Sequence, residues 1–412
     1  MKKLVFPIIF TVVGLSFTAY SFLDTFIIVK NARSVDLDHN SGFSFDDGPV
    51  IKPPVSSSSN SSTTGSSNSS NSSSSIVQNP EDLDPSEYYE NMTSEQIAAL
   101  FTTEKKFEER EHYSDPDIYV DITTHRDNAD TTTYYVADIR LKSLGYMKTA
   151  LAEDRYGMHI KERTSDICKR KKGILAINGD TYGEQEGGFV VRNGRALQST
   201  KNLDRMRNTT KKAEDLVIRN DGTFSIIDEN STNLVIHEVS AATKEEEEKK
   251  RGTVFDLLDS NGTQIGDQTN IWQIFCFGPA LVNNNQVIVN ENEEVGTAMS
   301  GNRNQRCAIG IIAPRHYVFV VSDGRSDESS GLSLKTLGEI MKDLHCQCAY
   351  NLDGGGSATM YLDDGTGNAN GLGHLVNKPT QDLTGGYGHG GGGTTIGQRE
   401  VSDIVYIGKD QD

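Results

Sequence analysis

The sequence has few cysteines, a single tryptophan and a deficit of positive charge. Five cysteines in 412 residues, an odd number scattered along the chain, exclude a disulfide scaffold and a zinc ribbon. With 58 acidic and 40 basic side chains the net charge is −18, which excludes a general nucleic-acid binder because such a protein needs a basic surface. A hydrophobic content of 35% excludes both a multi-spanning membrane protein and a wholly disordered chain. Part of the chain must therefore fold around a core.

Common catalytic motifs are absent as well. The sequence contains no H-x-x-x-H, C-x-x-C, G-x-S-x-G or P-loop motif, which excludes the usual zincin, redox, esterase and nucleotide-binding proteins. Cys346 and Cys348 form a C-x-C pair before a strand, and two core thiols explain this pair better than a metal site does. We therefore expect neither a cofactor nor a bound metal.

The longest apolar run lies at the amino terminus. Residues 4–23 carry no charge and follow Lys2 and Lys3, and at ~1.5 Å per residue they would span a ~30 Å hydrocarbon core. We expect residues 1–30 to be an uncleaved anchor, which makes this a single-pass protein of the cell membrane with its carboxyl-terminal domain outside the cell. The alternative is a cleaved signal sequence, which would leave the protein secreted.

A low-complexity segment follows the apolar run. Residues 56–75 consist of fourteen Ser, three Asn, two Thr and one Gly, with no apolar side chain to offset the entropy of ordering. We expect residues 31–90 to form a disordered Ser/Asn-rich linker. Residues 91–412 then form the folded domain.

Strand patterns outnumber helix patterns in this domain. Runs of β-branched and aromatic residues flanking turn-forming residues predict hairpins over 117–142, 215–228, 277–289 and 306–325. Amphipathic spacing predicts helices over 94–110 and from Ser333 to Leu344. The pattern indicates an α+β fold with a mixed, mainly antiparallel sheet and flanking helices, preceded by one transmembrane helix and a disordered stalk.

The segment NLDGGGS at 351–357 gives the strongest indication of a functional site. Asp353 ends an apolar strand and is followed by three glycines, which allow a sharp turn and the close approach of a ligand to the backbone. The alternative is an Asp-Gly turn between two strands, but such a turn needs only one glycine.

Three other strand ends carry polar side chains. Asn178 and Asp180 follow the strand GILA, Arg306 precedes the strand CAIGII, and Asp323 and Arg325 end another strand. An arginine that enters an apolar strand needs an anionic partner such as a phosphate or a carboxylate. The alternative in each case is structural: a turn stabilised by its own side chains, or a salt bridge.

Eight segments resemble, in the same order, those of the phosphodiester glycosidase family. They are AINGD at 176–180, GGFVVRNG at 187–194, FGPALV at 277–282, RCAIG at 306–310, SDGR at 322–325, GLSLKTLGEIM at 331–341, NLDGGGSATM at 351–360 and REVSDIVYI at 399–407. The resemblance covers about 134–406. It implies a hydrolase that cleaves a sugar-1-phosphodiester at the anomeric carbon and releases a free sugar and a phosphomonoester.

The resemblance also implies roles for individual residues. Asp353 is the candidate nucleophile, base or electrostatic partner of an oxocarbenium-like transition state, with Asp323 or Asp180 as the second acid/base. Arg306 and Arg325 are candidates for neutralising the phosphate through forked hydrogen bonds. The remaining candidate substrate-binding residues are Asn178, Asn351, Gly354, Gly355, Gly356 and Ser357.

Together these features predict an extracellular, membrane-tethered glycosidase acting on phosphate-linked glycans of a cell envelope or exopolysaccharide. The expected partners are the glycan and, through the N-terminal helix, a membrane, but no nucleic acid. One alternative is a surface glycan-binding module without catalysis. The other is a metal-dependent phosphodiesterase, because Asp180, Asp323, Asp353 and Asp363 carry the oxygen ligands that hard cations accept.

Overall fold

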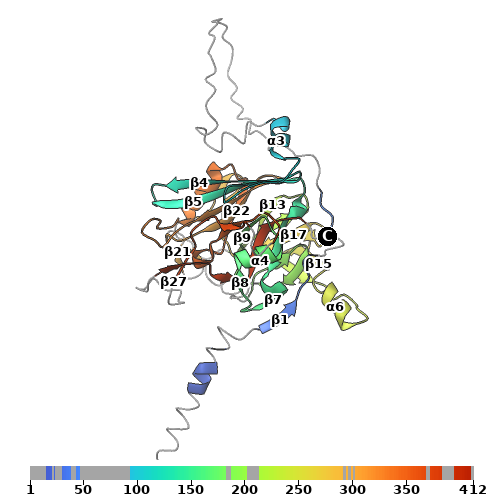
Figure 1. Ribbon diagram of the computed structural model, residues 1–412. Coiled ribbons are helices and arrows are strands. Elements are labelled where there is room, and N and C mark those ends of the chain that lie inside the picture. Colours follow the sequence, from blue (N-terminus) through green and yellow to red (C-terminus); the bar gives the residue numbers. More distant parts are fainter. Residues whose placement is uncertain are drawn as a thin grey trace, which may run out of the picture.

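The computed structural model describes residues 15–20, 23, 30–38, 43–46, 93–181, 187–201, 213–290, 294–295, 298–299, 302–367, 372–382 and 394–409. These residues are mostly β-sheet (Figure 1). Their α-helices are short: α3 (Ser94–Leu100), α4 (Thr164–Arg170), α6 (Lys244–Lys250) and α7 (Leu334–Asp343).

Nine strands form the largest sheet. Their spatial order is β19 (Gln286–Val287), β18 (Ala280–Asn283), β24 (Cys348–Leu352), β22 (Cys307–Ala313), β23 (His316–Ser322), β5 (Thr132–Leu141), β4 (Ile118–Asp127), β3 (His112–Ser114) and β2 (Lys106–Glu108). Each neighbouring pair in this sheet is antiparallel.

Two five-stranded sheets pack with it. One has the order β26 (His374–Leu375), β25 (Met360–Leu362), β9 (Leu175–Asn178), β30 (Asp403–Ile407) and β6 (Met147–Leu151). The other has the order β11 (Arg195–Gln198), β10 (Val190–Arg192), β17 (Ile271–Phe275), β12 (Glu214–Arg219) and β13 (Phe224–Asp228). Within both sheets, too, the neighbouring strands are antiparallel.

Smaller sheets complete the described part. One has three strands, β14 (Thr232–Ile236), β15 (Phe255–Asp259) and β16 (Gln264–Asp267). The others have two strands each: β1 (Lys30–Ser34) pairs with β7 (Arg155–Met158), β8 (Glu162–Arg163) with β29 (Glu400–Val401), β20 (Glu294–Val295) with β21 (Ala298–Met299), and β27 (Thr380–Asp382) with β28 (Thr394–Ile396).

One apolar core lies between the three large sheets. Ile139 and Phe319 of the nine-stranded sheet pack in the same buried cluster as Leu175, Met360 and Leu216 of the other two. The opposite faces of two of these sheets are covered by helices, and that of the sheet containing β10 by β14 and β15. The apolar side of α7 packs on the nine-stranded sheet and that of α4 on the sheet containing β9. Antiparallel strands with an inner apolar face therefore account for most of the buried surface.

The predicted α+β class is wrong, because the described residues are mostly antiparallel β-sheet with few helices. The amphipathic pattern over 94–110 yields only α3, after which the chain enters β2 at Lys106. Pairing of β2 with β3 extends the nine-stranded sheet, and this tertiary contact overrides a weak helix preference.

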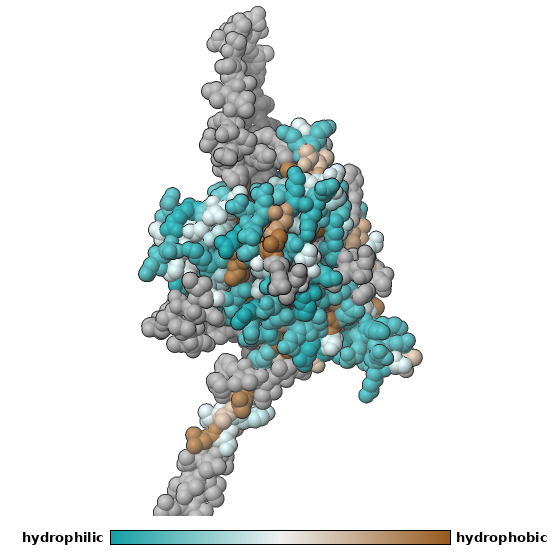
Figure 2. Space-filling model, viewed as in Figure 1, coloured by the Kyte–Doolittle hydropathy of each residue, from teal (hydrophilic) through white to brown (hydrophobic). Residues whose placement is uncertain are grey.

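The other predicted elements lie where expected. The four hairpins correspond to β4–β5, β12–β13, β18–β19 and β22–β23. Helix α7 begins after Ser333, whose hydroxyl accepts a hydrogen bond from the Thr336 amide at 3.0 Å, as an N-cap does. The charged run at 244–250 forms α6, which buries none of its side chains and projects from the molecule as a hydrophilic knob (Figure 2).

The predicted transmembrane helix is not found: in the part of the chain that the structure describes, no helix is long and apolar enough to cross a bilayer. Of the predicted span 4–23, residues 15–20 and 23 are described. The Ser/Asn-rich run at 56–75 lies outside the described residues.

Residues 30–38 and 43–46 contact the domain. Strand β1 pairs with β7, and Leu37 is buried in the same cluster as Val190 of β10. Phe43 and Phe45 each lie 4.8 Å from the ring centroid of Trp272. The linker boundary predicted at residue 31 is therefore corrected: the fold includes 30–38 and 43–46, and the Ser/Asn-rich run connects two segments that both contact the domain.

Candidate active site

Three strand ends meet at one edge of the nine-stranded sheet. In the register of this sheet Cys307 of β22 lies opposite both Leu352 of β24 and Val321 of β23. Because these strands are antiparallel, Arg306 precedes β22 at the same edge at which Asp353 follows β24. Residues that are far apart in the sequence thus become neighbours.

Asp353 opens a loop that connects two sheets, since β24 belongs to the nine-stranded sheet and β25 to the sheet containing β9. Gly355–Ser357 form a single 3-10 turn in this loop. Gly355 has φ +59°, and a Cβ atom at Gly354 would lie 2.6 Å from the carbonyl oxygen of Gln305. Two of the three glycines are therefore required by the backbone itself.

Hydrogen bonds fix both the backbone and the side chain of Asp353. Its amide donates to the carbonyl of Gly179 at 3.1 Å, and its carbonyl accepts from Asn178 Nδ2 at 2.6 Å. Its Oδ2 atom accepts from Arg399 Nη2 at 3.1 Å. The side chain keeps 12% exposure, so the carboxylate is held in place and still reaches solvent.

Arg399 is the residue that the sequence analysis missed. It lies 46 positions after Asp353, and no local pattern links the two. Its Nε and Nη2 atoms also donate to the Ser357 hydroxyl at 2.9 and 2.6 Å. A signal was available, because Arg399, like Arg306, is an arginine at the start of a largely apolar strand segment.

Arg306 is a buried cation whose described hydrogen bonds go to neutral carbonyl groups. Its Nε donates to Leu332 O at 3.0 Å and its Nη2 to Asn302 O at 2.7 Å. None of the described carboxylates forms an ion pair with it within 4 Å. Burial, reinforced by the nearby charge of Arg325, lowers the pKa of Arg306 to about 10. An anionic ligand would relieve both effects.

Arg325 lies against the glycine turn. Its Nε donates to Asn304 Oδ1 at 2.9 Å, and its Nη2 lies 3.0 Å from the position that a Cβ of Gly355 would occupy. The turn at Gly354–Ser357 is thus bordered by Arg325 as well as by Arg399. Positive charge gathers around the loop that carries Asp353.

Asp323 is a second buried carboxylate at the same sheet edge. It is 5% exposed, and it accepts hydrogen bonds from the Lys378 amide at 2.7 Å and from the Tyr135 hydroxyl at 3.2 Å. Burial raises the pKa of Asp323 above its usual value, and these two hydrogen bonds partly oppose that rise. Because β23 and β24 flank β22, their ends lie roughly 10 Å apart.

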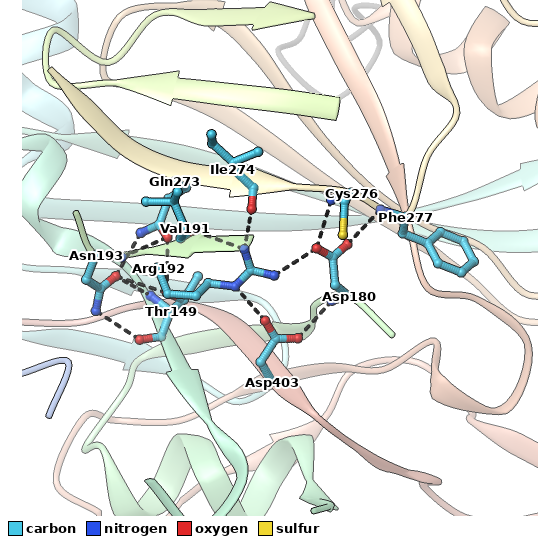
Figure 3. Close-up of polar contacts among 10 residues, drawn as sticks. All are labelled: Thr149, Asp180, Val191, Arg192, Asn193, Gln273, Ile274, Cys276, Phe277 and Asp403. Atoms are coloured by element: carbon cyan, nitrogen blue, oxygen red, sulfur yellow. Dashed lines mark hydrogen bonds and ion pairs between the residues drawn. The ribbon is translucent and has the colours of Figure 1, made fainter. Parts of the chain in front are cut away.

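Asp180 lies in a separate, fully buried ion cluster with Arg192 and Asp403 (Figure 3). Its Oδ2 accepts from Arg192 Nη2 at 2.8 Å and from the Cys276 amide at 2.9 Å, and its Oδ1 accepts from the Phe277 amide at 3.1 Å. Both oxygens are occupied by the protein. The structure therefore gives Asp180 a structural position rather than the predicted acid/base position.

This cluster is connected through Gly179 to the loop that carries Asp353. Asp403 accepts from the Asp180 amide at 2.8 Å through Oδ1 and from the Gly179 amide at 3.0 Å through its carbonyl. The Gly179 carbonyl in turn accepts from the Asp353 amide. The Gly179 residue thus connects the buried ion cluster to the backbone of Asp353.

The three polar side chains predicted to bind the substrate form hydrogen bonds within the protein, and two of them, Asn178 and Ser357, brace this loop. Asn178 also accepts from the Thr359 amide at 3.1 Å, so it holds both ends of the loop. Asn351 donates through Nδ2 to Gly278 O at 2.8 Å, and Ser357 accepts from Arg399. Asn178, Asn351 and Ser357 are each at most 1% exposed.

The four aspartates considered as metal ligands do not gather at one point. Asp363, for example, accepts from the Tyr361 hydroxyl and from the Asp364 amide at the edge of β25. Within the described ranges no group of three or more His, Cys, Asp and Glu side chains is arranged to hold a metal ion.

A carboxylate paired with a partly buried guanidinium group lies on a loop joining antiparallel sheets, at the sheet edge that also carries the buried Arg306. This arrangement suits a glycoside hydrolase site for a substrate with an anionic group. The model of the phosphodiester glycosidase family matches residues 171–407, which is more than half of the chain. The chain belongs to this family, as its ordered segments indicated, and is a hydrolase that cleaves sugar–phosphodiester bonds.

The solved structures that match the chain are distant from it in sequence. The catalytic domain of zebrafish N-acetylglucosamine-1-phosphodiester alpha-N-acetylglucosaminidase, auto-inhibited by its pro-peptide, is 16% identical with a TM-score of 0.45, over 77% of this chain and 94% of that one. A hypothetical protein from Synechocystis is 14% identical (TM-score 0.42; 71% and 62%). A putative exported protein from Burkholderia pseudomallei is 14% identical (TM-score 0.43; 68% and 74%). No curated protein matches the chain.

Proposed function

We propose that the enzyme hydrolyses a sugar-1-phosphodiester at the anomeric carbon, with Asp353 facing that carbon and Arg306 and Arg325 binding the phosphate. The bond between C1 and the bridging oxygen breaks, water supplies a hydroxyl to C1, and the phosphate leaves as a monoester. The observation that carries this proposal is the burial of Arg306, which has no carboxylate partner among the described residues, at the sheet edge that Asp353 shares.

Leaving-group chemistry explains why guanidinium groups suit this reaction. A phosphate monoester has a second pKa of ~6, so its departure needs less protonation than that of an alkoxide. Its developing charge is what must be stabilised. Hydrogen bonds to charged groups contribute about 1.5–3 kcal/mol each, and more where water is excluded.

Asp323 is the proposed second carboxylate. A buried carboxyl with a raised pKa retains its proton to higher pH, which is what a general acid requires. In this scheme Asp353 acts as nucleophile or base and Asp323 assists the departing phosphate or the incoming water.

The proposed substrate is a phosphate-linked glycan of a cell envelope, outside the cytoplasm. Support comes from the uncharged run at 4–23, whose composition suits an export sequence. Detection of the domain in the medium or on intact cells would test this location, and a purely cytoplasmic protein would contradict it.

The reaction is tested with the full-length enzyme and a panel of synthetic sugar-1-phosphomethyl esters in oxygen-18 water. We expect the label in the released sugar. Label in the phosphate, or no turnover of any ester, would refute the proposal.

The phosphate-binding role is tested separately with Arg306→Met. We expect the loss in kcat/KM on the diester to exceed the loss on a neutral aryl glycoside by about 10- to 100-fold, the equivalent of one charged hydrogen bond. Arg155→Met is the matched control, because Arg155 pairs with Glu153 at an exposed position. Equal losses on both substrates would remove the phosphate role from Arg306.

A further inference from the structure

Arg399 bridges two residues of the loop that carries Asp353, namely Asp353 itself and Ser357. Its Nη2 donates to Asp353 Oδ2 at 3.1 Å and to the Ser357 hydroxyl at 2.6 Å. Its own amide donates to the carbonyl of Gly356 at 3.2 Å. The Arg399 guanidinium and the Asp353 carboxylate thus form an ion pair.

The backbone that presents Arg399 is anchored on both sides. Gln398 exchanges hydrogen bonds with Ser165 at the start of α4, through Oε1 at 3.1 Å and Nε2 at 2.9 Å. On the other side Glu400 of β29 lies opposite Arg163 of β8. Arg399 therefore projects from a segment held against α4 and β8, outside the loop it contacts.

A turn with three consecutive glycines needs such a brace. Gly355 adopts φ +59°, and glycines lose more conformational entropy on ordering than any other residue. A planar guanidinium can hold two acceptors in a fixed geometry, whereas an ammonium group is a point charge. The bridge fixes the carboxylate relative to the rest of the turn.

We propose that Arg399 is the positioning residue of the Asp353 carboxylate: it holds Oδ2, keeps the group ionised and sets its orientation toward the anomeric carbon. The inference rests on the catalytic role proposed for Asp353. Nothing in the reaction requires Arg399 to contact the substrate.

Several charged or titratable groups face Asp353 from other elements. Cys307 on β22 is buried, and burial together with the Asp353 charge raises the pKa of its thiol. Arg325 lies beyond Gly355. Arg399 provides a positive charge in direct contact with Asp353, so its removal should make the ionised carboxylate less favourable.

Kinetics of Arg399→Ala on a sugar-1-phosphodiester form the first test. We expect kcat to fall about 10- to 100-fold with little change in KM, because misorientation of a catalytic group affects the transition state more than binding. Arg399→Lys should recover part of the loss, and added guanidinium ion should restore activity to Arg399→Ala. Arg155→Ala serves as the control with unchanged activity. A loss confined to KM, or no rescue by guanidinium, would overturn the proposal.

A second measurement does not depend on turnover. The carbon-13 signal of the Asp353 carboxyl, assigned by its disappearance in Asp353→Asn, is titrated in the wild type and in Arg399→Ala. We expect its midpoint to move to higher pH in the variant, and an unmoved midpoint would overturn the proposal. If Arg399→Ala fails to fold, Arg399→Gln, which keeps an amide donor without the charge, carries the same expectations. If the wild type hydrolyses no diester, the catalytic proposal fails. The carbon-13 titration still tests whether Arg399 stabilises the ionised Asp353 carboxylate.

Discussion

Replacing Arg192 by methionine would test whether the buried ion cluster behind the active-site loop maintains the fold. Arg192 is fully buried and donates to Asp180 Oδ2 at 2.8 Å, to Asp403 Oδ2 at 2.7 Å and to the carbonyl groups of Val191 and Ile274 (Figure 3). Methionine has a similar length and lacks the charge. The variant therefore leaves two carboxylates in an apolar interior without their counter-ion.

The expected cost is about 3–5 kcal/mol in the free energy of unfolding, as for removal of one partner from a buried ion pair. Typical domains have a stability of about 5–15 kcal/mol, so this variant loses a large part of it. The buried Asp403 charge becomes less favourable without Arg192, and we expect this carboxyl to take up a proton.

Proton uptake makes the effect dependent on pH. Burial raises the pKa of Asp403 to about 6 even with Arg192 present, and removal of Arg192 raises it further. A carboxyl whose folded-state pKa lies above its unfolded value stabilises the fold at low pH, and this stabilisation is lost as pH rises through the folded pKa. The deficit of Arg192→Met relative to the wild type should therefore be smaller at pH 5 than at pH 8.

Urea unfolding followed by tryptophan fluorescence at both pH values measures this, because Trp272 is largely buried. The triple variant Arg192→Met/Asp180→Asn/Asp403→Asn should recover part of the stability, since its side chains carry no charge. A deficit below about 1 kcal/mol that does not change with pH would refute the reasoning, because it would match an exposed ion pair.

Three further outcomes are expected. Asp353→Asn should abolish turnover and leave the unfolding midpoint nearly unchanged, and residual activity above one per cent or so would contradict its role. Tyr135→Phe removes a hydrogen bond that lowers the pKa of Asp323, so the alkaline limb of the pH–rate profile should move to higher pH if Asp323 is the acid. A protease site inserted in 56–75 should yield, after cleavage, two fragments that stay associated and active, because residues 30–38 and 43–46 pack on the domain. Separation of the fragments on gel filtration would show that this packing is weak.

Local chemistry explains the elements that were predictable. The hairpin β4–β5 and the hairpin β22–β23 follow from alternating β-branched residues around turn-forming ones, and α7 follows from its apolar spacing and the Ser333 cap. These signals act within a few residues and need no knowledge of the rest of the chain. The family, too, was evident from eight ordered segments.

Long-range pairing explains what was not predictable. The 94–110 pattern became one short helix and a strand because the edge of the nine-stranded sheet was available to pair with it. Asp180 looked like a site carboxylate from its place at a strand end, yet Arg192 and Asp403, the latter 211 positions from Arg192, enclose it in the interior.

The active site combines both kinds of information. The sequence alone indicated, as candidates, the carboxylate and glycines of the segment 351–357 and the two arginines at strand ends, because strand termini and glycine runs are visible locally. Strand register brought Arg306 beside Asp353, and closure of the chain across α4 and β8 brought Arg399 to it. Which charge faces which carboxylate depends on contacts between segments distant in the chain, and only the folded arrangement of the sheets specifies them.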